Sequence, residues 1–460
     1  MKDNGTVAAI STPPGEGGIG IVRISGPDAL AIGAKVFRRR GGGAAGMEER
    51  RLCYGRIIGK DGAPVDNGFM VCMKAPRSYT GLDTVELHCH GGPLVMKEAL
   101  EAALEAGARL AGPGEFTRLA FLNGKLDLAQ AEAVIDVIRA ETYSALASAR
   151  GRLEGAFSKK VRGVKDALAD ILAEIEARLD FPEEELPAMP DVTDGLGAAG
   201  GLLQRLIDSF EEGHALRDGV RALILGRPNV GKSSLLNILL QEERAIVTAA
   251  PGTTRDIIEE AVVLRGIPIR LMDTAGLRET LDPVEAIGVR IARERVERSD
   301  LIIFVVDATA FSKEDAELLP IADGKKLIVA ANKDDLASAF EREELIRALP
   351  GRRVVFLSAQ TSGGVETLKD AIYAEAAGHP FAAPGSARLA ELTVTVRHRD
   401  ALAKAQEAAL RAGEALAANT PLECAAADLR AALSALGEIT GETAPEDILE
   451  RIFSNFCIGK

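Results

Sequence analysis

The feature that most constrains the fold is the glycine-rich string GRPNVGKS at residues 226–233. It follows the apolar run 222–225 and precedes residues 234–240, which have the composition of a helix. Strand, glycine loop and helix in this order are typical of a phosphate-binding loop, where backbone N–H groups and a helix N-terminus face the phosphates. We therefore expect an α/β domain here, in which Lys232 reaches the β- and γ-phosphates and Ser233 binds Mg²⁺.

Four further motifs follow along the chain. Thr254 lies in a GTTRD loop and can offer its hydroxyl to the same Mg²⁺, and Asp273 opens a DTAG run that places a carboxylate near the metal. The string NKDD ends in Asp335, whose carboxylate suits the N1 and amine donors of guanine, a pairing that adenine does not offer. The string SAQ at 358–360 should complete the base pocket. The residues expected to contact GTP are Asn229, Val230, Gly231, Lys232, Ser233, Ser234, Thr248, Ala249, Ala250, Pro251, Gly252, Thr253, Thr254, Asp273, Thr274, Ala275, Gly276, Asn332, Lys333, Asp334, Asp335, Ser358, Ala359 and Gln360.

The position that often orients the attacking water in GTPases is not a glutamine in this chain. The residue directly after the DTAG run is Leu277, which cannot hydrogen-bond to water. Another group must therefore position the water. The candidates downstream are Arg278, Glu279, Asp282 and Glu285, and each of them could equally be a solvated switch residue.

The spacing of apolar residues and of Gly/Pro turns along the chain predicts three kinds of domain. Residues 1–122 mix short apolar strands with Gly/Pro turns, as an α+β domain does. Residues 123–217 and 379–460 carry apolar positions at helical spacing, so we expect one all-α helical domain that is split in sequence. Residues 218–378 alternate strands and helices, which predicts an α/β P-loop GTPase domain inserted into the helical one.

The composition limits the partners and the compartment. A net charge of −13, 4% aromatic residues and no Trp provide neither a global positive field nor stacking platforms, so an RNA partner needs a local patch or a second protein. Five cysteines without a CxxC pair argue against a disulfide framework and a zinc site. No signal-peptide pattern or membrane-length apolar run is found in the sequence, and we expect a cytoplasmic protein without a membrane partner.

The sequence resembles, nearly end to end, the tRNA-modifying GTPases called MnmE or TrmE. Beyond the GTPase motifs, the resemblance is carried by PGEGGIG at 14–20, RISG at 23–26, ELHCHGG at 86–92, GEFTRLAFLNGKLDLAQAEA at 114–133, LDFPEEE at 179–185 and FCIGK at 456–460. It implies a homodimer formed through the N-terminal domain and potassium-stimulated hydrolysis when two GTPase domains meet. It also implies a heterotetramer with an FAD-binding protein of the MnmG or GidA family. This complex would install a carboxymethylaminomethyl or aminomethyl group at carbon 5 of the tRNA wobble uridine, using a folate one-carbon unit.

Site residues also follow from this resemblance. By matching motifs, the contacts to 5-formyl-tetrahydrofolate or a related folate are Arg23, Glu86, Lys125 and Lys460. The matching potassium ligands are Asn229, Thr248, Ala250 and Thr253, and Glu285 matches the glutamate that positions the water.

The residue chemistry fits the folate assignment. Arg and Lys suit the folate carboxylates, and a carboxylate such as Glu86 suits the N–H donors of the pterin. The alternatives are an ordinary ion pair for Arg23 and Glu86, and a metal site at His88 and His90, which lacks further ligands at the usual spacing. Where the family usually has Gln-Gly, this chain has His88 and Cys89, so neighbouring contacts can differ.

Two rival functions and two terminal residues stay open on the sequence alone. A ribosome-assembly GTPase usually carries a basic RNA-binding module, and neither flank here is basic. A purely regulatory GTPase leaves the N-terminal glycine motifs unexplained. Cys457 can be a chemical group or a small packing residue. Lys460 ends a tip that would normally be frayed, and a folate carboxylate would give its ammonium a partner and order the tail.

Overall fold

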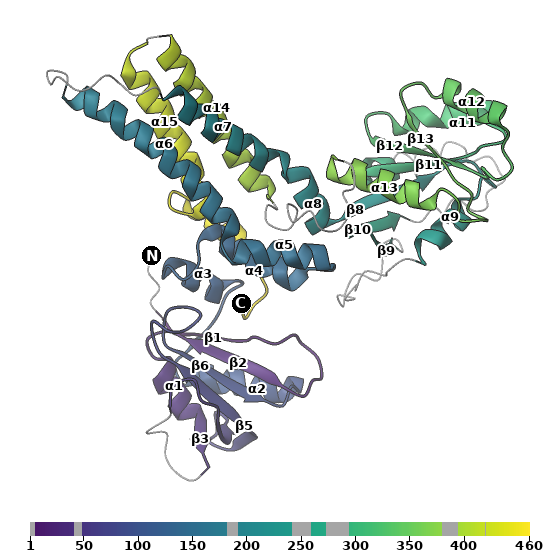
Figure 1. Ribbon diagram of the computed structural model, residues 1–460. Helices are drawn as coiled ribbons and strands as arrows, with labels where there is room; N and C mark the ends of the chain where they lie inside the picture. Colours follow the sequence, from purple (N-terminus) through teal and green to yellow (C-terminus); the bar gives the residue numbers. More distant parts are fainter. Residues whose placement is uncertain are drawn as a thin grey trace. The chain divides into compact units, whose positions relative to one another are not determined.

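The computed structural model describes residues 5–40, 48–181, 192–241, 259–272, 294–379, 394–418 and 420–460 (Figure 1). The chain divides into two compact units, Met1–Ile135 with Gly437–Lys460, and Asp136–Leu436. The first unit therefore contains both ends of the chain. Across the described ranges, no helix is both long and apolar enough to cross a membrane.

The first unit is built on a seven-stranded sheet of order β3-β4-β5-β6-β2-β1-β7. Neighbouring strands are antiparallel except for the parallel pair β1 and β7. The strands are β1 (Val7–Ile10), β2 (Gly20–Ser25), β3 (Phe37–Arg39), β4 (Cys53–Ile58), β5 (Pro64–Met73), β6 (Thr84–Cys89) and β7 (Arg109–Leu110).

Two helices, α1 (Ala29–Val36) and α2 (Pro93–Glu105), pack against the apolar face of this sheet. Because side chains alternate along a strand, Val22 and Ile24 of β2 enter the core while Arg23 between them faces away. The opposite face carries polar side chains such as Arg23, beside a small apolar cluster of Val7, Ala9, Ala111 and Phe116.

The remainder of the first unit is helical. It contains α3 (Glu115–Leu122), the first part of α4 (Leu128–Arg139), the end of α15 (Leu422–Thr440) and α16 (Glu446–Ser454), followed by residues 455–460. Helix α16 contacts α3, and rings of Phe121 and Phe453 lie 6.4 Å apart. These contacts bring the last helix of the chain beside one of the first.

The helices of the second unit come from both sides of the GTPase domain. They are α5 (Tyr143–Leu153), α6 (Ala156–Asp180), α7 (Thr193–Asp208), α8 (Phe210–Asp218), α14 (Val396–Ala417) and most of α15. Helix α6 contains no proline and a single glycine, and it buries Val164, Leu168, Ile171 and Ile175 at helical spacing. Helix α7 packs against both α6 and α14. Helices from before and after the GTPase domain in sequence thus pack together in this unit.

The α/β part of the second unit has a six-stranded sheet of order β13-β12-β11-β8-β10-β9. All neighbours are parallel except β10 and β9. Its elements are β8 (Val220–Leu225), α9 (Lys232–Leu239), β9 (Glu259–Leu264), β10 (Ile267–Met272), β11 (Leu301–Asp307), α11 (Lys313–Leu318), the 3-10 helix η2 (Leu319–Ala322), β12 (Lys326–Asn332), α12 (Ala339–Ala348), β13 (Arg353–Phe356) and α13 (Val365–Ala377).

The parallel arrangement explains why the nucleotide motifs meet. Strands β8, β11 and β12 are buried on both faces, as their continuous apolar runs predict. The carboxyl ends of parallel strands lie at one edge of a sheet, where ligands of α/β domains bind. The loops after β8, β12 and β13 therefore come together at that edge.

Candidate functional site

The phosphate-binding loop owes its shape to two glycines. Gly226 has φ +152°, and a Cβ atom there would lie 2.2 Å from the carbonyl oxygen of Val305. Gly231 has φ +98°, and its Cβ would lie 2.1 Å from Nδ2 of Asn332. Any larger residue at either position would push the loop away from the strand ends. Helix α9 begins directly after Gly231, so its free N–H groups face the loop.

Both basic side chains of this loop, Lys232 and Arg227, donate hydrogen bonds to protein groups. Lys232 Nζ donates to the carbonyl oxygens of Gly226 at 2.8 Å and Arg227 at 2.5 Å, so the ammonium lies across the loop. Arg227 Nε donates to Asp315 Oδ1 at 2.6 Å, which ties the loop to α11. Asn229 has φ +64°, a left-handed backbone that asparagine adopts more readily than most residues.

Asn332 connects the phosphate loop to the base-binding loop. Its Nδ2 donates to the Val230 carbonyl at 2.8 Å, and its Oδ1 accepts from the Ala359 amide at 2.8 Å. The side chain is only 3% exposed. Both polar ends of one buried amide are thus satisfied by loops that lie far apart in sequence, and the two loops are fixed to each other.

Two other residues of the NKDD string differ in their contacts: the Lys333 side chain is held by an ion pair, and the Asp335 side chain is exposed. Lys333 Nζ donates to Asp307 Oδ2 at 2.6 Å. Burial works to raise the pKa of Asp307, but the hydrogen bonds from Lys333 and Thr309 lower it overall. Asp335 is exposed and has no hydrogen bond or ion pair within the described part of the chain. Its carboxylate is therefore available to a ligand at this edge.

The structure brings together the described members of the predicted GTP site. Residues 229–234 form the phosphate loop and the start of α9, residues 332–335 follow β12, and residues 358–360 follow β13. Ser358 is buried, and its amide donates to Gly363 at 2.9 Å, which closes the second loop. The remaining predicted residues lie outside the described residues: Thr248, Ala249, Ala250, Pro251, Gly252, Thr253, Thr254, Asp273, Thr274, Ala275, Gly276 and Glu285.

A second polar site lies on the open face of the N-terminal sheet. Arg23 on β2 and Glu86 on β6 are cross-strand partners, and Arg23 Nε donates to Glu86 Oε1 at 2.9 Å. Each side chain is 16% exposed. The Arg23 guanidinium also lies 5.5 Å from the ring centre of Phe116 and 5.9 Å from that of Tyr79. The pair is therefore more enclosed than an ordinary surface ion pair.

The C-terminal tail lies against this pair. The Gly459 carbonyl accepts from Ser11 Oγ at 3.0 Å and from Arg23 Nη1 at 3.4 Å. The Lys460 carbonyl accepts from the Phe116 amide at 3.1 Å. Gly459 has φ +98°, and a Cβ atom there would lie 2.2 Å from the Ile10 carbonyl oxygen. These contacts hold the tail, which is the yellow end of the ribbon marked C in Figure 1, in place.

The Lys460 side chain shares the surroundings of the ion pair. Burial lowers the pKa of its ammonium, and the nearby Arg23 guanidinium lowers it further, whereas Glu86 and Cys457 act in the opposite direction. Three of the four residues predicted for folate, Arg23, Glu86 and Lys460, therefore lie together. Cys457 is exposed on the same tail.

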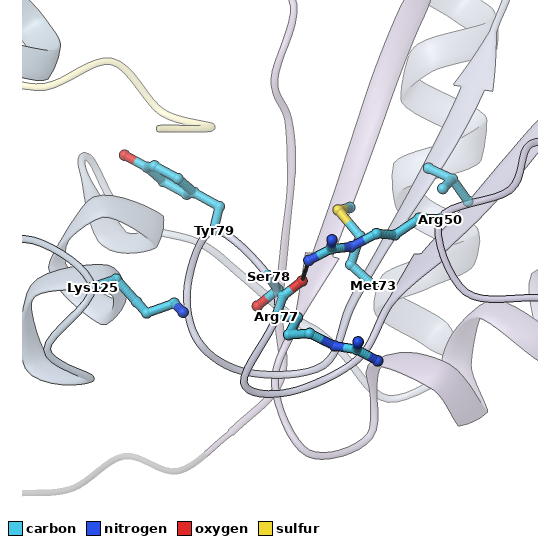
Figure 2. Close-up of a pocket in the computed structure, with 7 residues that line it drawn as sticks. Arg50, Met73, Arg77, Ser78, Tyr79 and Lys125 are labelled. Carbon is cyan, nitrogen blue, oxygen red and sulfur yellow. Dashed lines mark hydrogen bonds between the residues drawn. The ribbon is translucent and has the colours of Figure 1, made fainter.

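The fourth predicted residue, Lys125, lies on the rim of a neighbouring pocket of about 450 Å³ (Figure 2). Sequence reasoning missed Ser11, Tyr79 and Phe116 around Arg23. Tyr79 follows Ser78 in a short polar loop, and its hydroxyl lies 2.9 Å from Thr117 Oγ1. Of these three residues, only Phe116 lies within a motif that carries the family resemblance, the one that begins GEFT.

The two histidines of the ELHCHGG motif pair with different carboxylates. His88 Nε2 lies 3.4 Å from Glu86 Oε2, and His90 Nδ1 lies 2.9 Å from Asp66 Oδ1. Hydrogen bonds from the amide and ring of His90 and from the Asn67 amide lower the pKa of Asp66, although burial alone would raise it. The carboxylates thus hold the two rings in separate hydrogen-bonded pairs.

Comparison with known proteins finds family matches for both the N-terminal part and the remainder of the chain. The family model described as the GTP-binding protein TrmE N-terminus matches residues 6–125, and the MnmE helical domain model matches residues 128–457. Two proteins described as tRNA modification GTPase MnmE, from Geotalea uraniireducens and Geobacter metallireducens, are 46% and 48% identical over 459 residues, 99% of each chain. Among solved structures, the G domain of the T. maritima FeoB iron transporter is 32% identical, covering 34% of this chain and 98% of that one with a TM-score of 0.26. The full-length matches and the two family models show that this chain belongs to the MnmE family of tRNA modification GTPases.

Proposed function

We propose that this GTPase is stimulated by potassium and acts with an FAD-binding protein of the MnmG or GidA family on tRNA. The complex adds a carboxymethylaminomethyl or aminomethyl group at carbon 5 of the wobble uridine, with the carbon taken from a formyl-tetrahydrofolate. The family membership and the names of the relatives as tRNA modification GTPases support the tRNA modification. The cytoplasm is the compartment that this role requires.

In this proposal, GTP binds at the edge of the parallel sheet where the carboxyl ends of the strands lie. The N–H groups of the phosphate loop and Lys232 hold the phosphates, and Asp335 accepts from guanine. Ser233 and Thr254 hold Mg²⁺, which neutralises phosphate charge. The fixed link through Asn332 supports this assignment, because it sets the distance between the phosphate loop and the base pocket before a nucleotide binds.

The potassium ligands and the water-positioning group complete the proposed reaction. Asn229, Thr248, Ala250 and Thr253 hold K⁺, which supplies the positive charge that an arginine finger supplies in other GTPases. Glu285 orients the attacking water. The homodimer brings two such domains together. Asn229 is the one of these four residues within the described ranges, and it lies in the phosphate loop, where an amide oxygen can bind a cation beside the phosphates.

The folate half rests on one observation, the C-terminal tail lying against Arg23 and Glu86. Glu86 accepts from the pterin N–H groups, and Arg23 holds the Glu86 carboxylate in place. Lys460 offers an ammonium to the anionic ligand, and Lys125 stands further along the same face. This arrangement would leave the tRNA largely to the partner protein, since the chain itself has a net charge of −13.

Isothermal calorimetry with 5-formyl-tetrahydrofolate tests the folate half. We expect Glu86→Gln to weaken binding at least about tenfold, because the variant loses a charged acceptor and leaves Arg23 unpaired. The matched control is Glu101→Gln on α2, which removes the same charge from the helix-covered side. GTP hydrolysis should be unchanged in both variants. Equal folate affinity in both variants contradicts the assignment of Glu86.

A further inference from the structure

A cationic pocket lies on the same domain as the proposed folate site. Three positively charged side chains line it, Arg50, Arg77 and Lys125, together with Tyr79 and Val71 (Figure 2). Figure 2 shows Lys125 reaching toward the loop of Arg77 from the side opposite Arg50. The pocket volume of about 450 Å³ falls within the range of small-molecule sites.

Two residues connect this pocket with the Arg23–Glu86 pair. Val71 on β5 lines the pocket and is the cross-strand partner of Glu86, so the backbones of these two residues lie one strand spacing, about 5 Å, apart. Tyr79 lines the pocket and carries the Arg23 guanidinium 5.9 Å from its ring centre. Val71 and Tyr79 thus place the pocket next to the Arg23–Glu86 pair.

The pocket carries an excess of positive charge. Arg77 Nη2 pairs with Glu49 at 2.8 Å, and Arg50 Nε lies 3.9 Å from the same residue. Arg50 Nη2 also donates to the backbone carbonyl of Arg77 at 2.6 Å, which holds the Arg50 guanidinium against the loop of Arg77. Lys125 has no ion pair within the described ranges. Two of the three cations, Arg50 and Arg77, thus share the single carboxylate of Glu49, and anions are the favoured ligands of the pocket.

We propose that this pocket binds the glutamate end of the folate, and that Arg50 and Arg77 make the protein select folates with a poly-γ-glutamate tail. The inference rests on the proposed folate function and extends it to the form of the substrate. Each γ-linked glutamate adds one α-carboxylate, and a guanidinium can bind a carboxylate through two parallel hydrogen bonds. The first glutamate reaches Lys125, and the following ones reach the two arginines.

The expected selectivity is modest because both arginines are largely exposed. Their side chains are 58% and 69% exposed, so solvent and salt screen each new ion pair. Two such pairs correspond to a preference of about fivefold at low salt. High salt should reduce this preference toward none.

Calorimetry on the full-length protein tests the proposal. The two ligands are 5-formyl-tetrahydrofolate with a single glutamate and the same compound with a pentaglutamate tail. We expect the long form to bind about fivefold more tightly to the unmodified chain. The double variant Arg50→Gln, Arg77→Gln should lose this advantage and keep its affinity for the short form. The single variant Arg77→Gln, at the more exposed position, should lose about half of the advantage in free energy.

Lys97→Gln is the matched control, because Lys97 is an exposed cation on α2 at the helix-covered side of the sheet. It should keep the full preference for the long form. Equal binding of both forms to the unmodified chain overturns the inference and leaves the folate function standing, as does a double variant that keeps the preference. Failure of both forms to bind refutes the folate function itself.

Discussion

Replacing Asn332 with aspartate should uncouple the two loops of the nucleotide site. The aspartate keeps the size of the side chain and an acceptor for the Ala359 amide. It has no hydrogen to donate to the Val230 carbonyl, which Nδ2 of Asn332 contacts at 2.8 Å. A carboxylate would instead face that carbonyl in a position that is 3% exposed in the native side chain. The phosphate loop and the base-binding loop would then lose their fixed spacing.

The expected loss of nucleotide affinity follows from the hydrogen bond that is lost. A buried acceptor left without its donor costs about 1–3 kcal/mol, and a buried unpaired charge adds to this cost. A total of about 3 kcal/mol, applied to the conformation that binds nucleotide, weakens affinity about a hundredfold.

Titration with a fluorescent GDP analogue measures this effect. The matched control is Asn237→Asp, which introduces the same charge at an exposed position of α9 and should change affinity less than about twofold. If Asn332→Asp binds GDP as tightly as Asn237→Asp does, the amide does not couple the loops and the reasoning fails.

Four other predictions follow from the sites. Hydrolysis should be fast in KCl and slow in NaCl at equal ionic strength, with Asn229→Ala abolishing the difference; equal rates in both salts for the unmodified chain would contradict the potassium site. Glu285→Ala should lower kcat strongly with GTP affinity nearly intact, and normal turnover would transfer the role to another residue. Deleting residues 457–460 should weaken 5-formyl-tetrahydrofolate binding in calorimetry while potassium-stimulated hydrolysis persists; full-strength binding would show that the tail is dispensable. Asp307→Asn should destabilise the GTPase domain by about 1 kcal/mol at pH 7 in urea unfolding. Because the folded pKa of Asp307 is lowered, this difference should vanish as the pH falls below about 4, and a pH-independent difference would contradict it.

The fold was largely predictable from local patterns. Helix α6 follows from a long run with helical apolar spacing and no proline, and the position of Lys232 at the start of α9 follows from the strand and glycines before it. These signals depend on residues close together in the chain, where spacing and turn chemistry decide the structure.

The link made by Asn332 was not predictable in the same way. Its partner Val230 lies 102 positions away, so only the packing of the sheet brings the amide to the loop. The docking of the tail is similar, since Gly459 and Ser11 are separated by 448 positions. A terminal glycine indicates flexibility by itself. Its close approach to the Ile10 carbonyl depends on tertiary structure, which a single sequence does not display.

The central claim is tested most directly by mass analysis of tRNA wobble uridines in cells with and without the gene. We predict that the nucleoside with a modified carbon 5 disappears when the gene is removed. It should return with the intact chain, and it should not return with a chain that lacks residues 457–460 or carries Lys232→Ala. An unchanged wobble-uridine profile in cells without the gene would contradict the account.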